Sequence, residues 1–224
     1  MKLKNLGNTN EQVSVVGLGT WQFGGEWGVE YDAKQVDSIF DAARDCGINL
    51  IDTAECYGDH LSESFIGAAI ESDRDNWFVA TKFGHHFETK FTRSELHSGK
   101  DVVTQLEDSL KALRTDRIDL YQYHSWNNDE VYAEDVQAAL LKAKDDGKIR
   151  FLGNSVQTQG DSSIQVAQCT EHQMEAIQIV YNRLAREPEA KSFPICEQEN
   201  LGVLARVPLA SGYLSGKYLS LIHI

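Results

Sequence analysis

Short apolar runs alternate along the chain with longer segments in which apolar residues recur every three or four positions. The short runs are typical of buried strands, and the longer segments are typical of amphipathic helices. The pattern predicts strands at residues 13–17, 48–51, 77–82, 118–124, 149–153, 176–181 and 203–207. It predicts helices between them, at 32–46, 60–70, 100–113, 129–146, 161–170 and 189–200, and a small β-hairpin within residues 1–14.

This alternation of strand and helix predicts an α/β protein with a parallel sheet, either a doubly wound open sheet or a (β/α)8 barrel. A doubly wound dinucleotide-binding unit carries G-x-G-x-x-G directly after its first strand. Here the segment 17–22 lacks the third glycine, and no helix follows it at once. Polar residues also follow several of the strands, so we favour the TIM barrel with an N-terminal β-hairpin.

The number of strands falls short of a complete barrel. A barrel has eight strands in about 250 residues, whereas this chain of 224 residues shows seven. Residues 219–224 carry no helical pattern, and they match the translation of a sequencing adaptor. We therefore expect a truncated barrel domain at 1–218, with its last βα units missing, and a non-native tail at 219–224. A short natural tail and a broken gene product are the alternatives.

The composition argues against nucleic acid and membrane as partners. The net charge of −13 opposes binding to phosphates, which needs a basic surface. No run approaches the about 18 apolar residues of a membrane span, and the first residues lack the apolar stretch of a signal peptide. The scattered cysteines indicate reduced thiols of a cytoplasmic protein, at Cys46, Cys56, Cys169 and Cys196.

Four residues at predicted strand ends could work together. Asp52 follows the second predicted strand, and Tyr57 lies in the loop after it. Lys82 ends the third strand and His124 ends the fourth. Taken singly, each side chain could be an ordinary cap, rim or half-buried residue. Because a barrel gathers the carboxyl ends of its strands at one mouth, we expect all four to converge there.

A phenol, an ammonium, a carboxylate and an imidazole at one mouth suit carbonyl reduction or alcohol oxidation. The ammonium of Lys82 would stabilise the phenolate and lower the pKa of Tyr57 from its ordinary value of about 10. Asp52 would hold Lys82 charged, and His124 would orient a carbonyl oxygen while Tyr57 donates a proton. Such a set has no nucleophile and no metal, so a cofactor must supply the hydride.

Several short motifs cover nearly the whole chain before the tail. They lie at 17–21, 52–58, 80–84, 118–124, 178–182 and 208–218. Together they resemble the aldo/keto reductase superfamily. The resemblance implies a (β/α)8 barrel that uses NAD(P)H to reduce an aldehyde or ketone reversibly to an alcohol. It also implies that Tyr57 is the general acid, tuned by Lys82 and Asp52, and that His124 orients the substrate.

The resemblance further implies a cofactor site, with NADP(H) preferred over NAD(H). Its nicotinamide end would lie along Gly19, Thr20, Trp21 and Asp52. Ser155 and Gln178 would bind the carboxamide, and Tyr181 would stack on the ring. The pyrophosphate would be lined by Leu209, Gly212, Leu214 and Lys217. Val156 replaces the family's asparagine after Ser155, so one carboxamide hydrogen bond is missing or made elsewhere.

Loop aromatics at the same mouth suggest a pocket for a small apolar carbonyl compound, lined by Trp21, Phe23, Trp27 and Trp126. Simple packing over the barrel is the alternative. His85 and His86 with Glu88 lack helical ligand spacing, so we expect no metal site. Cys56 has no partner cysteine nearby in the sequence, and we expect a packing role for it.

The leading hypothesis is therefore an NAD(P)H-dependent carbonyl reductase that acts on a small molecule. The alternative is a cofactor-binding regulatory or redox-sensor subunit with little turnover. The presence of all four proposed site residues favours the enzyme, although a sensor with slow turnover could also carry them.

Overall fold

The central sheet is made of parallel strands in the order β11-β10-β9-β8-β5-β4-β3, in a computed structural model that describes residues 1–216. Each strand pairs in parallel with its neighbours in this order. The strands are β3 (Leu18–Gly19), β4 (Leu50–Asp52), β5 (Phe78–Phe83), β8 (Ile118–His124), β9 (Ile149–Ser155), β10 (Ala176–Val180) and β11 (Gly202–Arg206). This arrangement confirms the predicted incomplete (β/α)8 barrel.

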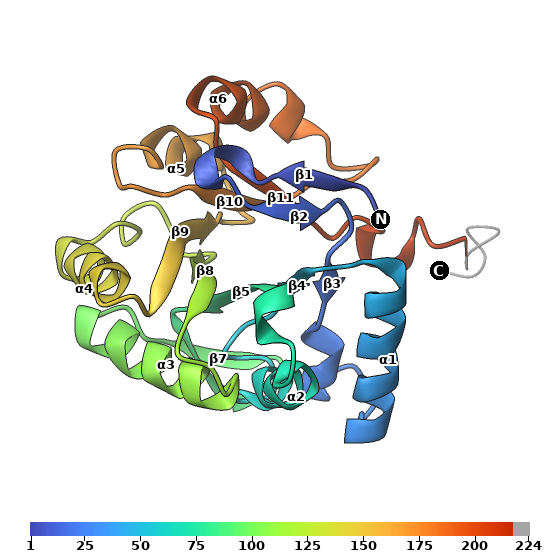
Figure 1. Cartoon of the computed structure of the whole chain (residues 1–224). Helices are drawn as coiled ribbons and strands as arrows, with labels where there is room; N and C mark the ends of the chain where they lie inside the picture. Colours follow the sequence, from blue (N-terminus) through green and yellow to red (C-terminus); the bar gives the residue numbers. More distant parts are fainter. Residues whose placement is uncertain (217–224) are drawn as a thin grey trace.

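Helices alternate with these strands and lie around the sheet (Figure 1). Helix α1 begins after Asp32, whose side chain accepts a hydrogen bond from Gln35 N at 2.8 Å, and ends at Gly47 with φ of 68°. These are the cap signals that predicted it. The helices are α1 (Ala33–Cys46), α2 (Leu61–Ile70), α3 (Gly99–Ala112), α4 (Glu134–Asp145), α5 (Ser163–Gln168) and α6 (Ser192–Glu199). In the described residues, no helix combines the length and the apolar character of a bilayer span.

Two predictions of local structure are wrong. The predicted strand 13–17 divides, because Val13 and Ser14 pair with Lys4 and Leu3 in the antiparallel hairpin of β1 (Leu3–Asn5) and β2 (Gln12–Ser14). The first barrel strand is instead β3. Residues 84–97, where the pattern predicted neither a strand nor a helix, form a second hairpin, β6 (His85–Thr89) and β7 (Thr92–Glu95). Its residues are largely polar, so no apolar alternation marked it.

The β1–β2 hairpin packs against the amino-terminal ends of the barrel strands. Leu6 and Val13 are buried in one cluster with Leu50 and Leu204. Gly7 has φ of 54°, and a Cβ there would lie 2.2 Å from Gly202 N, so only glycine allows this approach. The hairpin therefore closes the end of the barrel opposite Asp52 and His124.

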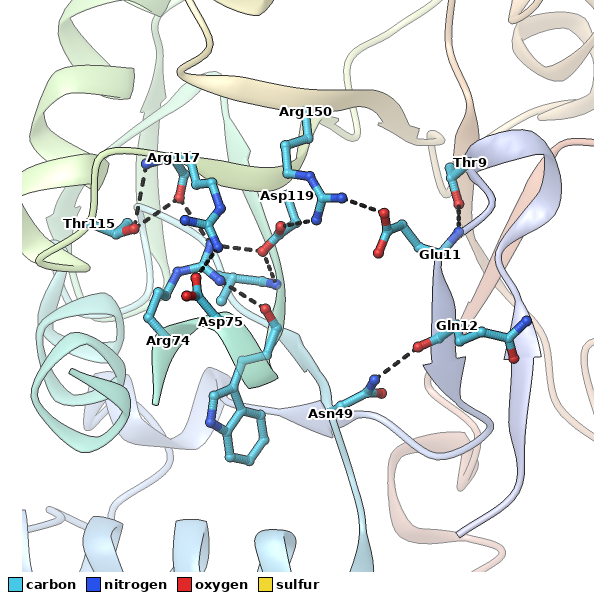
Figure 2. Close-up of polar contacts among 12 residues, drawn as sticks. Thr9, Glu11, Gln12, Asn49, Arg74, Asp75, Thr115, Arg117, Asp119 and Arg150 are labelled. Carbon is cyan, nitrogen blue, oxygen red and sulfur yellow. Dashed lines mark hydrogen bonds and ion pairs between the residues drawn. The ribbon is translucent and has the colours of Figure 1, made fainter. Parts of the chain in front are cut away.

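A charged network fastens this end of the barrel (Figure 2). The buried carboxylate of Asp119 accepts hydrogen bonds from Arg74 Nη2 and Arg150 Nη1, both at 2.7 Å, and from Val79 N at 2.9 Å. Arg150 also pairs with Glu11 of the hairpin. Asp119 thus links β5, β8 and β9 to the N-terminal hairpin.

Replacing Asp119 with asparagine should lower the free energy of unfolding by about 1.5–3 kcal/mol, the usual range for hydrogen bonds to charged groups. Urea denaturation measures the change. The exposed Asp75, which pairs with Arg117, offers the control: Asp75→Asn should leave stability almost unchanged because solvent screens this pair. Equal losses in the two variants would contradict the role given to Asp119.

Candidate active site

The carboxyl ends of β4 and β5 bring an acid and a lysine together. Lys82 Nζ donates to Asp52 Oδ1 at 2.8 Å and to the carbonyl of Thr53 at 2.6 Å. It lies 3.5 Å from the hydroxyl of Tyr57, which the loop after β4 carries back over the strand ends. Lys82 is 1% exposed, whereas the side chain of Asp52 is 26% exposed at the mouth. The structure therefore places three of the four expected residues in direct contact.

His124 lies on the other side of Tyr57. It is the last residue of β8, and its ring centroid is 6.1 Å from that of Tyr57 at nearly a right angle. Its Nδ1 lies 3.7 Å from Cys56 Sγ. Burial, with His85 and Lys82 nearby, holds the pKa of His124 well below its ordinary value. The imidazole is therefore neutral at physiological pH and can offer one N–H donor.

Burial dominates the acidity of Tyr57. It raises the pKa of Tyr57 to about 12, even though the Lys82 ammonium acts in the opposite direction. The sequence predicted a lowered pKa, and this expectation is wrong because the phenolate would be buried. For Lys82, burial opposes the charge, but Asp52 and Tyr57 outweigh it and hold its pKa above the ordinary value. Lys82 is thus charged and Tyr57 protonated at neutral pH.

The residues expected at the carboxamide join the same network. Gln178 Nε2 donates to Asp52 Oδ1 at 2.6 Å, and Ser155 Oγ bonds to Gln178 Oε1 at 3.4 Å. The ends of β9 and β10 are therefore connected to the Asp52–Lys82 pair. Val156 is buried next to Ser155 and adds no polar side chain at this point.

The other expected cofactor residues lie at the ends of β3, β10 and β11. Space is open in front of Gly19, since no atom lies within 4 Å of a Cβ built there. Thr20 is buried and donates to the carbonyl of Asp52 at 3.0 Å. Tyr181 is partly buried, with its hydroxyl on Glu189 and its ring against Phe193. The turn η5 (Ala210–Gly212) holds Gly212 between Leu209 and Leu214, both exposed. Lys217 and the tail 219–224 lie outside the described residues.

An exposed aromatic patch covers one side of the mouth. Trp21 stacks on Tyr57 at 5.7 Å, and Trp27 packs edge-on against Trp21 at 4.8 Å. Phe91 completes the patch from the turn between β6 and β7, at 5.3 Å from Trp27. The sequence did not predict Phe91 at the mouth, because no apolar pattern marks the hairpin that carries it.

Two aromatics expected in the pocket wall lie in the core. Phe23 is 4% exposed and packs on Tyr31. Trp126 is 2% exposed, and its indole lies so close to Gly84 that a Cβ there would be 1.9 Å from Nε1. Packing of these large rings against neighbouring side chains outweighs their position in loops. The prediction that Phe23 and Trp126 line the pocket at the rim is therefore wrong.

One basic residue at the mouth was also missed. Arg206 ends β11, its Nη2 donates to the carbonyl of Val156 at 3.2 Å, and its buried Nε has no partner among residues 1–216. Asp52 and Tyr57 are close enough to act on its charge. The strand-end rule that selected Lys82 and His124 would also have found it. Arg206 gives the mouth a second cation suited to an anionic group.

Comparisons with known proteins agree on one family. The model of the aldo/keto reductase family matches residues 15–224. Aldo-keto reductase YhdN of Bacillus subtilis is 35% identical over 223 residues, which are 97% of this chain and 65% of that protein. The NADH-specific methylglyoxal reductase of Escherichia coli is 34% identical, over 96% of this chain and 70% of that protein.

A solved structure gives the same result. Holo aldo-keto reductase AKR11C1 from Bacillus halodurans superposes with a TM-score of 0.87 at 31% identity, covering 99% of this chain and 71% of that one. The chain thus spans about two thirds of the length of the curated relatives it matches, between 65% and 70% for the two named above.

Proposed function

The chain belongs to the aldo/keto reductase family, and from this premise we propose that it reduces an aldehyde or ketone to an alcohol with a nicotinamide cofactor. The observation that carries the proposal is the position of Lys82 Nζ, within reach of both the Asp52 carboxylate and the Tyr57 hydroxyl. A buried ammonium beside a phenol is an arrangement for delivering a proton.

Tyr57 acts as the general acid in this proposal. With a pKa of about 12 its hydroxyl stays protonated at neutral pH, yet it can still protonate an alkoxide, which is a stronger base than a phenolate. Lys82 is fixed by Asp52, so its charge stabilises the phenolate left behind without reorganisation. The three residues together hold and release one proton at the Tyr57 oxygen.

His124 orients the substrate. A neutral imidazole can donate one N–H to a carbonyl oxygen placed between it and Tyr57. The apolar patch of Trp21, Trp27 and Phe91 beside Tyr57 suits a small carbonyl compound with an apolar side.

The mouth fits a nicotinamide cofactor. Space is open at Gly19, Gln178 presents its amide beside Asp52, and Ser155 presents its hydroxyl beside Gln178. These residues, with Trp21, would hold the nicotinamide end, and the turn around Gly212 would approach the pyrophosphate. The cofactor supplies the hydride when it is bound. We propose NADP(H) rather than NAD(H), and kcat/KM with NADPH and NADH decides between them, since one relative is named NADH-specific.

Oxidation of NADPH with a panel of aldehydes and ketones tests the proposed function. Turnover that depends on the carbonyl compound is the expected result. Cofactor binding without turnover on any compound would favour a regulatory or redox-sensor subunit instead. Cofactor fluorescence, measured in parallel, separates that outcome from a failure to bind.

The burial of Tyr57 predicts an unusual pH dependence. Reduction needs the protonated phenol, so its kcat/KM should stay level between about pH 6 and about pH 9 and fall only as the pH approaches the high pKa of Tyr57. Oxidation of the alcohol needs the phenolate, so its rate should rise with pH over the same range. Stopped assays in both directions measure this, and a fall in reduction within that range would contradict the raised pKa.

A further inference from the structure

A second group of side chains converges beside Tyr57, from three strand ends. Glu55 and Cys56 lie in the loop after β4, His85 begins β6 directly after β5, and His124 ends β8. One candidate ligand atom from each of the four lies within 4.8 Å of the others. We propose that these four side chains form a binding site for a zinc ion.

Two atoms of this group lack the partners that buried polar atoms normally have. Glu55 is 3% exposed; its Oε1 accepts from His85 N at 2.9 Å, but its Oε2 has no partner in the described part of the chain. His85 Nδ1 is also buried and without a partner there. A buried carboxylate oxygen and an imidazole nitrogen, both free to donate a lone pair in one cluster, fit a cation.

The donor set fits zinc. Thiolate, imidazole and carboxylate are its usual ligands, and bonds of about 2.0–2.3 Å place tetrahedral ligand atoms about 3.3–3.8 Å apart. Cys56 Sγ and His124 Nδ1 already lie 3.7 Å apart. With the Cys56 thiolate, the Glu55 carboxylate and two neutral imidazoles, the complex carries no formal charge. A neutral complex is the form that burial penalises least.

The two cations that act on Cys56 are already paired with carboxylates. Burial raises the pKa of the Cys56 thiol above its ordinary value, and the nearby Arg93 and Lys82 act in the opposite direction. Lys82 pairs with Asp52, and Arg93 pairs with the buried Glu26. Each cation therefore has its own carboxylate, and neither needs Glu55.

An acidic cavity of about 420 Å³ leads to the site. Glu55 and His85 form part of its wall, and no lysine or arginine lines it. The carboxylates of Asp59, Asp101 and Asp108 also line it and would attract cations toward Glu55. The cavity gives an ion an entry route on the side of Glu55.

A zinc ion bound at this site would be ligated by His124, which the proposed reaction also uses. Ligation by a ring nitrogen fixes His124 in the metal complex and takes it from its proposed role of orienting the substrate, so zinc should slow carbonyl reduction. This consequence rests on the proposed function, whereas the binding itself does not.

Isothermal titration of the protein with ZnCl2, and with CoCl2 as a spectroscopic probe, tests the site. We expect one equivalent of Zn²⁺ to bind and Co²⁺ to give thiolate charge-transfer absorption. Glu55→Gln, Cys56→Ser and His85→Asn should each weaken binding at least about tenfold, in line with the effect of losing groups that hold a metal. The matched control is His86→Asn, since His86 is the exposed neighbour of His85 and should not affect binding.

Three results would overturn the proposal: no stoichiometric binding to the folded protein, a Co²⁺ charge-transfer band that survives in Cys56→Ser, or binding that is lost instead in His97→Asn. The last would assign the ion to Glu95, His97 and Glu130, the other group with compatible spacing in the described residues. Circular dichroism of each variant confirms that the fold is intact. Because binding is read directly, it can succeed or fail independently of turnover.

Discussion

Replacing Tyr57 with phenylalanine is expected to lower kcat for carbonyl reduction by about 10²- to 10⁴-fold, the range that a positioned general acid contributes. The substitution removes only the hydroxyl near Lys82 and keeps the ring that stacks on Trp21 at 5.7 Å. Cofactor affinity should therefore be nearly unchanged. Steady-state kinetics together with cofactor fluorescence measure both quantities.

Tyr123→Phe is the matched control for this variant. Tyr123 is a buried tyrosine of the same sheet, and its hydroxyl donates to Gln137 at 3.0 Å, away from the mouth. Losing that bond should cost about 1 kcal/mol of stability but leave kcat near the wild-type value. Comparable kcat in Tyr57→Phe and Tyr123→Phe would remove Tyr57 from the mechanism.

Replacing Lys82 with methionine should reduce both activity and stability. Without the ammonium, the forming phenolate loses its stabilising charge, and kcat should fall by about 10²- to 10³-fold, as when a preorganised electrostatic group is removed. The pair of the buried Lys82 with the partly exposed Asp52 is also broken, and breaking a fully buried pair typically costs about 3–5 kcal/mol. Gln178 still donates to Asp52 and should keep the loss toward the lower end of that range. Kinetics and urea denaturation measure the two effects.

The control for Lys82 is Lys142, an exposed lysine paired with Asp146 on α4. Lys142→Met should leave kcat and stability almost unchanged, because solvent screens such a pair. If Lys82→Met kept wild-type kcat, the ammonium would have no part in proton delivery.

The sequence predicted much of this architecture because buried strands and helices leave short, periodic patterns of apolar residues. The run at 118–124 is apolar enough to identify β8, and Asp32 with Gly47 marks both ends of α1. The strand-end rule then placed Asp52, Lys82 and His124 at one mouth, where the structure has them. Their catalytic roles stay predictions until the variants are measured.

Other features depend on contacts between distant segments, which no local pattern reports. The raised pKa of Tyr57 follows mainly from the loss of solvent around its partly buried side chain, so a pairwise argument with Lys82 gave the wrong direction. The burial of Trp126 depends on its packing against Gly84, and the patch at Trp27 depends on a hairpin that brings Phe91 to it. The Glu55–His85–His124 group likewise comes from three separate loops and strand ends.

Transfer of deuterium from the cofactor tests the central claim most directly. The protein is incubated with NADPH deuterated at both C4 positions and an aldehyde that it turns over, and the alcohol is analysed by NMR and mass spectrometry. We predict that the wild type forms an alcohol with one deuterium on the former carbonyl carbon. The rate of this transfer should be about 10²- to 10⁴-fold lower in Tyr57→Phe. An alcohol without deuterium at that carbon, or equal rates of transfer in the two proteins, would contradict the account.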